Sequence, residues 1–418
     1  MKHKLWLISL CTVNFAFADK CDELMSAKQY ESALVTCNAY AESGTASAQR
    51  NLGLMYLLGY GTESNDVSAF KWFLASAQNG DAGAQYILGA MYADGQGIKQ
   101  DHTKAIYWYQ KSAEQGHAAA QYNLGNMYNS GRGIKQDYTK ATYWYQKSAE
   151  QGYAAAQYNL GNMYNSGRGI KQDYTKAAYW YQKSAEHGDA SAQFNLAVSY
   201  AKGEGVKQDY TQALYWYQKS AEQGDASAQF NLGVMYDLGR GVKQDYTQAL
   251  YWYQKSAEQG YAAAQNNLGM MYDFGQGTKQ DYNQAVYWYQ KSAEQGNANA
   301  QANLGVLYLQ GNGVRQDYPK AKTLLLAAAK QNNRSAQYHL GLLAYRESNY
   351  KDALMWYGKS ANQGYSDAQL NLGYMYENAL GVKKNIKTAY QWYQKSADQG
   401  NQIATNNITN LRNRGLIK

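Results

Sequence analysis

Few residues in this chain have the types and the spacing that catalysis requires. Ser348 lies three positions before Lys351, which is the spacing of the nucleophile and its lysine in the first motif of serine β-lactamases. Neither a Ser-Asp-Asn nor a Lys-Thr-Gly element accompanies this pair anywhere in the sequence. A chance match is the simpler interpretation, so we expect no catalytic residues, and β-lactamase-like activity remains the alternative.

Metal and phosphate binding find little support either. Gly131-Arg132-Gly133 followed by Lys135 could suggest a phosphate loop, but no strand is expected before it and the element recurs between helices. The histidines beyond the N-terminal segment fall at different registers, so no two of them form a metal-ligand pair at helical spacing: His102, His117, His187 and His339. We therefore expect neither a metal nor a cofactor.

The charge of the chain does not favour nucleic acid as a partner. The formal net charge of +8 is modest for 418 residues, and no later stretch is apolar enough to cross a membrane. Basic loop residues recur along one edge, each offset by an aspartate two positions later: Lys99, Lys135, Lys171, Lys207, Lys243, Lys279 and Arg315. A solvated edge is the simpler interpretation, and weak attraction to an anionic cell-envelope polymer remains open.

The strongest candidate for binding is a polar stripe. Asn123, Asn126, Met127 and Ser130 follow the spacing of one helix face. A row of amides could hydrogen-bond the backbone of an extended peptide, or it could bond neighbouring helices and only set their spacing. The position three residues after each of these asparagines, such as Asn126 after Asn123, varies more between repeats and would carry selectivity. The candidate partner-binding residues are Asn123, Asn126, Asn159, Asn162, Asn195, Val198, Asn231, Val234, Asn267, Met270, Asn303 and Tyr374.

These positions belong to a unit that is copied along the chain. Residues 153–188 repeat residues 117–152 with three changes, at His117, Thr142 and Gln151. An Ala-Gln dipeptide recurs every 36 residues, with 32 between the last two copies. Such self-similarity predicts a repeat architecture. The dipeptides begin at Ala48, Ala84, Ala120, Ala156, Ala192, Ala228, Ala264, Ala300, Ala336 and Ala368.

Each unit is predicted to form two helices. In the third unit the first helix covers about residues 118–129, and a Gly-x-Gly loop follows it. The second helix begins near Asp137, a suitable N-cap, and ends at Gly152. Gly125 lies inside the first helix, where glycine costs about 1 kcal/mol relative to alanine. We therefore expect the partner helix to approach closely there.

The N-terminus predicts export. Lys2 and Lys4 precede an apolar stretch, and a small-residue pattern ends at Ala18, where we place a cleavage point. Cys11 lacks the small preceding residue of a lipoprotein signal, which disfavours a lipid anchor. Cys21 and Cys37 flank a predicted helical hairpin, so a disulfide is expected in an oxidising compartment, with two buried thiols as the alternative.

The pattern resembles the Sel1-like repeat family, a relative of tetratricopeptide repeats. The resemblance rests on Ala120, Leu124, Gly125 and Tyr128, on the Gly-x-Gly loop, and on the Trp-Tyr pair of the second helix. It implies an all-α fold, a right-handed α-solenoid of helix-turn-helix repeats whose first helices line the concave side. Members act mostly as adaptors and scaffolds. Some cysteine-rich relatives are described as β-lactamase-like, but this sequence lacks their disulfide pair in each repeat.

The repeat pattern predicts the domain boundaries of the chain. Residues 1–18 form a signal peptide, residues 19–44 an N-terminal capping hairpin, residues 45–400 ten repeats, and residues 401–418 a C-terminal cap. The repeats are predicted at residues 45–80, 81–116, 117–152, 153–188, 189–224, 225–260, 261–296, 297–332, 333–364 and 365–400.

These features together predict an exported, non-enzymatic scaffold. We expect a monomer, periplasmic or secreted, that binds a protein or peptide partner on its concave face. The resemblance implies a role in envelope assembly or host-cell contact. The alternative is a β-lactamase-like or peptidoglycan-interacting protein.

Overall fold

The computed structural model describes residues 20–417, and the predicted signal peptide at residues 1–18 lies outside them. The described residues form 23 helices and no strand. The chain divides into two compact units within α12, one ending at Ser220 and the other beginning at Ala221. The helices of the first unit are α1 (Lys20–Ser26), α2 (Tyr30–Glu42), α3 (Ala46–Leu58), α4 (Asp66–Gln78), α5 (Ala82–Asp94), α6 (His102–Glu114), α7 (Ala118–Ser130), α8 (Tyr138–Glu150), α9 (Ala154–Ser166), α10 (Tyr174–Glu186), α11 (Ala190–Lys202) and α12 (Tyr210–Glu222).

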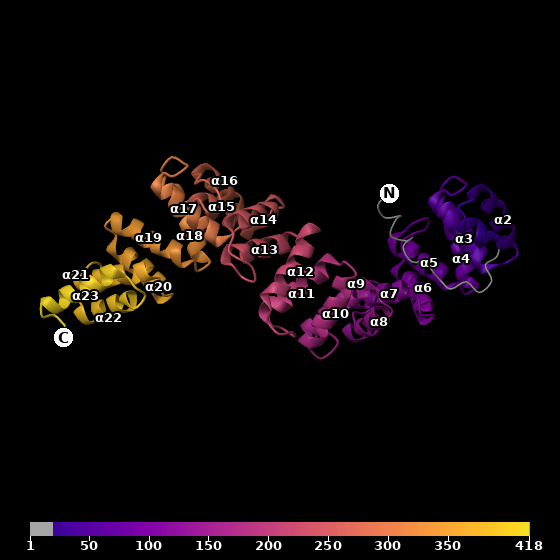
Figure 1. Ribbon diagram of the computed structural model, residues 1–418, viewed down its shortest axis with the longest axis horizontal. Helices are drawn as coiled ribbons and strands as arrows, with labels where there is room; N and C mark the ends of the chain where they lie inside the picture. The colour runs from indigo at the N-terminus through magenta and orange to yellow at the C-terminus, as the bar shows by residue number, and fades with distance from the viewer. Residues whose placement is uncertain (1–19, 418) are drawn as a thin grey trace. The chain divides into compact units, whose positions relative to one another are not determined.

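The second unit continues the same alternation of helices. It contains α13 (Ala226–Leu238), α14 (Tyr246–Glu258), α15 (Ala262–Phe274), α16 (Tyr282–Glu294), α17 (Ala298–Gln310), α18 (Tyr318–Lys330), α19 (Arg334–Arg346), α20 (Tyr350–Asn362), α21 (Ser366–Asn378), α22 (Ile386–Ala397) and α23 (Gln402–Asn413). From α2 to α11, and again from α13 to α23, each helix packs on the next one in the chain (Figure 1). This succession of helix-turn-helix repeats is an α-solenoid, as the sequence predicted.

Local sequence signals set the ends of the helices. In the third repeat, α7 stops at Gly131, whose φ of 72° is left-handed and whose N–H bonds to the carbonyl of Met127. Glycine adopts this conformation without steric cost. The second helix, α8, starts after Asp137, whose side chain accepts a hydrogen bond from the N–H of Lys140. These caps place the two helices where the sequence predicted them.

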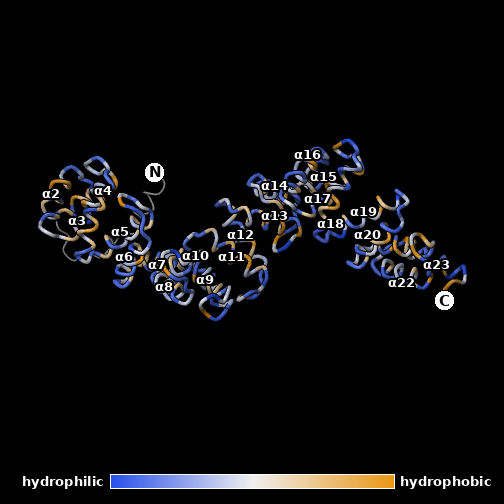
Figure 2. Tube along the Cα trace, turned by 180° about the vertical axis from the view of Figure 1, so that it is seen from behind, coloured by the Kyte–Doolittle hydropathy of each residue, from blue (hydrophilic) through white to orange (hydrophobic). Residues whose placement is uncertain are grey.

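The core is built from small repeated contributions. Alanines, leucines and the tyrosine of each Trp-Tyr pair are buried, for example Ala120, Leu124 and Tyr145 in the third repeat. Hydrophobic residues consequently occur along the whole trace in Figure 2 and do not gather in one region. Each repeat buries its apolar side chains against its neighbours, as solenoid repeats do.

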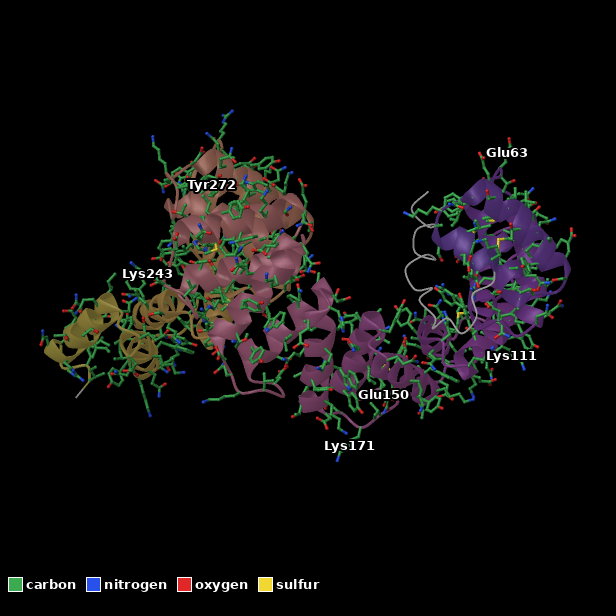
Figure 3. The ribbon with its side chains drawn as sticks, turned by 45° about the vertical axis from the view of Figure 1, so that its right-hand side comes forward. Glu63, Lys111, Glu150, Lys171, Lys243 and Tyr272 are labelled. Atoms are coloured by element: carbon green, nitrogen blue, oxygen red, sulfur yellow. A yellow bond between two sulfur atoms is a disulfide. The ribbon has the colours of Figure 1, made fainter. Side chains whose placement is uncertain are left out.

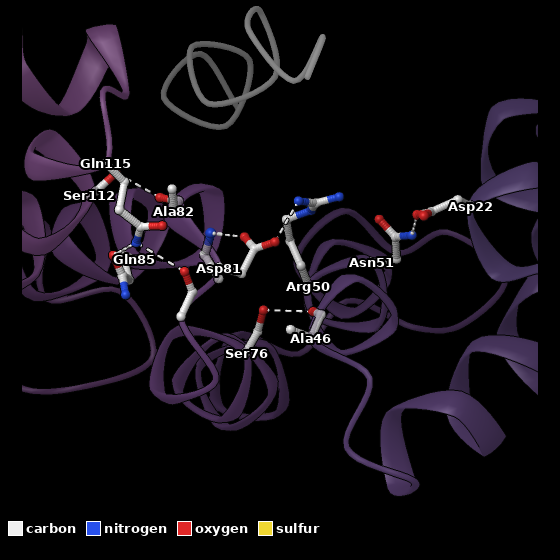
Figure 4. Close-up of polar contacts among 12 residues, drawn as sticks. Asp22, Ala46, Arg50, Asn51, Ser76, Asp81, Ala82, Gln85, Ser112 and Gln115 are labelled. Carbon is white, nitrogen blue, oxygen red and sulfur yellow. Dashed lines mark hydrogen bonds and ion pairs between the residues drawn. The ribbon is translucent and has the colours of Figure 1, made fainter. Parts of the chain in front are cut away.

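Buried polar groups bind the two helices of a repeat together and join one repeat to the next. The hydroxyl of Ser112 donates to the carbonyl of Ala82 at 2.7 Å, which ties the second helix of a repeat to the start of its first helix (Figure 4). The amide of Gln115 donates to Gln85 Oε1 at 2.8 Å, and that of Gln85 donates to the Ala77 carbonyl of the preceding repeat at 3.1 Å. The same serine and glutamine contacts recur in the third repeat.

The first hairpin is closed covalently. Cys21 in α1 and Cys37 in α2 form a disulfide, and both sulfur-bearing residues are fully buried. They pack against Leu52 and Met55 of α3. The sequence predicted this pairing. No helix among residues 20–417 is long and apolar enough to cross a membrane.

Candidate partner-binding surface

The predicted stripe lies on the first helices of the repeats, and we call the surface formed by its asparagines and varied positions the first-helix face. Its asparagines are half-buried, including Asn123, Asn159 and Asn195. Two of the varied positions in the second unit are exposed, with 37% of Met270 and 43% of Tyr374 accessible. Asn126, Asn162, Val198 and Val234, at the same register, are half-buried. The face is therefore partly accessible in both units.

A tyrosine of the second helix joins successive first helices across this face. The Tyr145 hydroxyl donates to Asn126 Oδ1 at 2.7 Å, and the amide of Asn159 donates to the same oxygen at 3.3 Å. Asn159 also hydrogen-bonds the Tyr145 hydroxyl. Burial raises the pKa of Tyr145, which keeps the phenol protonated as a donor. The three residues thus connect α7, α8 and α9.

The same connection recurs in other repeats. Tyr181 donates to Asn162 at 2.8 Å while the amide of Asn195 lies 3.3 Å from that oxygen. Asn123 hydrogen-bonds Tyr109, and Asn267 hydrogen-bonds Tyr253. Two asparagines bond differently: Asn303 donates to Asn266 of α15 at 3.2 Å, and Asn231 donates to the Ser227 carbonyl of its own helix at 2.8 Å. Contacts between repeats therefore occupy much of this row of asparagines, and its role in holding a peptide stays a prediction. The asparagine row consists of Asn123, Asn159, Asn195, Asn231, Asn267, Asn303 and Asn371.

Sequence reasoning missed the acidic residues of the second unit. The buried tyrosine donates there to a carboxylate: Tyr253 to Asp237 at 3.1 Å and Tyr289 to Asp273 at 3.2 Å. Tyr393 likewise donates to Glu377 at 2.8 Å. Burial raises the pKa of Asp273, and the hydrogen bond from Tyr289 opposes that shift. Aligning the repeats with one another would have revealed these residues, because α7 and α9 carry asparagine at the register where α13 and α15 carry aspartate.

A pocket opens on the first-helix face in the ninth and tenth repeats. Its volume is about 300 Å³, and its lining comes from α19, α20 and α21: Leu342, Tyr345, Tyr357, Asn371 and Tyr374. Two of these residues, Leu342 and Tyr374, occupy the varied position, and Asn371 belongs to the asparagine row. Burial raises the pKa of Tyr345, and the neighbouring Tyr374 adds to the effect. The pocket offers aromatic walls and phenol and amide hydrogen-bonding groups, which suit one large side chain of a partner.

A second aromatic row on the second helices was also missed. About half of each of these tyrosines is exposed, and a lysine ammonium four residues later lies over each ring: Tyr107, Tyr143, Tyr179, Tyr215, Tyr251 and Tyr287. Each ring also packs edge-on against the adjacent tryptophan. The tyrosines are therefore held by their own helix, away from the first-helix face.

The candidate catalytic pair and the basic loop residues of the sequence are exposed. Ser348 and Lys351 are exposed, in the turn between α19 and α20 and in the first turn of α20. The basic loop residues are all exposed, and the side chain of Lys171 extends away from the ribbon (Figure 3). Within residues 20–417, no three His, Cys, Asp or Glu side chains are grouped so that they could hold a metal ion.

The repeats of the chain match a known protein family. A family model described as Sel1 repeat matches residues 46–81, 82–117, 118–153, 154–189, 190–225, 226–261, 262–297, 298–333, 334–365 and 366–401. No curated protein matches the chain.

Two solved structures resemble the chain over most of its length. One is described as a protective antigen present in uropathogenic Escherichia coli strains displaying an SLR fold; it is 38% identical, the match covers 92% of this chain and 83% of that chain, and the TM-score is 0.85. The other is a Sel1 repeat protein from Oxalobacter formigenes, 33% identical over 82% of this chain and 100% of that chain, with a TM-score of 0.57. The chain therefore belongs to the Sel1 repeat family.

Proposed function

We propose that this protein is an exported, non-enzymatic scaffold that binds a protein or peptide partner on its first-helix face. The pocket formed by Leu342, Tyr345, Tyr357, Asn371 and Tyr374 carries the proposal, because it joins varied positions to a cavity of side-chain size. Sel1 repeat proteins generally act as scaffolds, which supports a binding role. The protein acts as a monomer, in envelope assembly or host-cell contact.

Two observations support export. The Cys21–Cys37 disulfide is of a kind that persists in oxidising compartments. The similar structure from Escherichia coli is described as a protective antigen, and an antigen that protects is accessible to the host. We infer a periplasmic or secreted location, with the signal peptide at residues 1–18 removed.

A peptide library displayed on phage tests the binding role. Peptides selected on the purified mature protein would be measured by fluorescence polarisation against the wild type and against Leu342→Asn/Tyr374→Asn. Asparagine is the residue at this register in α7 and α9, as Asn126 and Asn162, so the fold should tolerate both changes. We expect the affinity to fall by about tenfold or more, as loss of a pocket contact typically causes.

A variant outside the first-helix face provides a matched control. Tyr251→Ser removes a half-exposed tyrosine from α14 and should leave the affinity unchanged. Failure to recover any binding peptide, or an equal loss of affinity in the control and in the pocket variant, would overturn the proposal.

A further inference from the structure

The first helices of the sixth and seventh repeats expose an apolar surface that the third and fourth repeats lack. The exposed fractions are 52% for Leu238 and 65% for Phe274, beside the partly exposed Met270. Val234 and Leu238 are four positions apart on α13, as are Met270 and Phe274 on α15, so each pair lies on one side of its helix. We call this surface the α13–α15 patch; it consists of Val234, Asp237, Leu238, Met270, Asp273 and Phe274.

Hydrogen bonds hold the two helices in register. Tyr253 of α14 donates to Asp237 of α13 and hydrogen-bonds Asn267 of α15. Val234 also packs against the core cluster that contains Leu268 and Met271 of α15. Tyr253 therefore links α13 to α15, and the two apolar pairs occupy the same register of successive repeats.

The patch is acidic as well as apolar. Within α13, α15 and α17 the charged residues are Asp237 and Asp273, and these three helices contain no lysine or arginine. The nearest arginine in the sequence, Arg240, follows α13 in its loop. A carboxylate has about four acceptor sites, so the bond from Tyr253 or Tyr289 leaves each aspartate able to accept from a partner.

The third and fourth repeats provide an internal comparison. At the registers of the aspartates, α7 and α9 carry Asn129 and Asn165, and at those of Leu238 and Phe274 they carry Ser130 and Ser166. The same frame is thus neutral and polar in α7 and α9, and acidic and apolar in α13 and α15. Exposed apolar patches with a charged rim are typical of interaction sites.

We propose that the α13–α15 patch binds a cationic amphipathic segment of a partner, with two large apolar side chains between lysines or arginines. This inference rests on the proposed function, because it assigns a ligand class to the same face. The apolar side chains of the segment cover Leu238, Met270 and Phe274, and its cations pair with Asp237 and Asp273. Apolar contact supplies the affinity, and the carboxylates supply the preference for a basic sequence.

Two synthetic peptides test the inference. Both carry the same leucine and phenylalanine residues; one has lysines at the flanking positions and the other has glutamates. Their binding to the mature protein would be measured by fluorescence polarisation. We expect the lysine peptide to bind about tenfold more tightly than the glutamate peptide at low salt, with the preference shrinking as salt screens the aspartates.

Variants that copy residues of α7 and α9 separate the two contributions, because this fold already accommodates those residues. Asp237→Asn/Asp273→Asn should abolish most of the preference for lysine, whereas Leu238→Ser/Phe274→Ser should weaken both peptides by about tenfold. Tyr251→Ser on α14 should change neither. Circular dichroism melting curves would confirm that each variant is folded.

The inference is overturned if the lysine peptide does not bind at concentrations up to about 1 mM, or if the asparagine variant keeps the full preference. Its failure is distinguishable from failure of the proposed function. If the lysine peptide does not bind the patch, library peptides whose affinity depends on Leu342 and Tyr374 would still support a binding role for the first-helix face. The reverse result would retain the patch and reject the pocket.

Discussion

The ring of Tyr145 lies directly over Gly125 on the facing helix of the same repeat. A Cβ atom added at Gly125 would lie 2.7 Å from Cδ1 and 2.8 Å from Cε1 of that ring. The relationship recurs at Gly161, where the Cδ1 of Tyr181 would lie at 2.7 Å. Real Cβ contacts are essentially never that short, so the tyrosine, and not helix propensity, accounts for glycine at this register.

Replacing Gly125 by alanine should therefore destabilise the repeat, even though alanine is the better helix former. Overpacking costs about 1–3 kcal/mol, offset in part by about 1 kcal/mol of helix propensity. Hydrogen exchange of α7 and α8 would report the local loss of protection. The fifth repeat carries Ala197 at this register, so the change should weaken the fold without abolishing it.

Gly358 provides the control for this change. It lies within α20, and a Cβ there would meet nothing within 4 Å. Gly358→Ala should stabilise the protein by about 1 kcal/mol. If both alanine variants gained stability, the steric account of Gly125 would be wrong.

The helices of the third repeat were predictable because their signals are local. The sequence predicted a first helix over residues 118–129 and a second beginning near Asp137, and the structure has α7 at Ala118–Ser130 and α8 at Tyr138–Glu150. The apolar periodicity, the glycine loop and the aspartate cap all lie within a few residues of the helix ends that they determine. The close approach at Gly125 was also predicted, but the ring that causes it was not, since its position depends on how the facing helix packs.

The asparagine row was harder to interpret from the sequence. Asn159 lies in a different repeat from its partner Tyr145, and nothing in the spacing shows that the phenol of one repeat reaches the first helix of the next. We expect Asn159→Ala and Tyr145→Phe to be energetically coupled by about 1 kcal/mol, the size of a typical hydrogen bond. A double-mutant cycle of unfolding free energies measures the coupling. Additive effects would instead favour a row that serves only a ligand.

Acidification should destabilise the protein through two histidines. Burial lowers the pKa of His117, which stacks on Tyr86 and accepts the N–H of Ala120, and burial also lowers that of His339. The unfolded chain binds protons near the ordinary pKa of about 6.5, whereas the folded chain resists protonation at these sites. Their contribution to stability is thus full above that value and is lost as the pH falls through the lower folded pKa.

The variants His117→Asn and His339→Asn test this prediction, because other repeats already carry asparagine at both registers. Asparagine stands at the first register as Asn297 and Asn333, which cap their helices, and at the second register throughout the asparagine row. Melting temperatures from about pH 7.5 to about pH 5 should fall more for the wild type than for the double variant. Parallel curves for the two proteins would show that these histidines do not govern the acid response.

Removing the disulfide should loosen the N-terminal hairpin. Cys21 and Cys37 are 16 residues apart, and a cross-link closing a loop of that size stabilises by about 3 kcal/mol in the chain-entropy model. Cys21→Ala/Cys37→Ala should increase hydrogen exchange in α1 and α2 more than in later helices. A reducing agent should reproduce the effect in the wild type and have no effect on the variant. Two free thiols in the mass of the non-reduced wild type would refute the bridge.

The near identity of residues 117–152 and 153–188 has a genetic consequence. The hydroxyl of Ser148 and that of Ser184 each donate to a carbonyl 30 residues earlier, so the two copies share this contact between their two helices. Recombination between the corresponding DNA segments would delete or duplicate one whole repeat and rejoin the helices in register. The length of the first-helix face can therefore change by one repeat in a single inherited event.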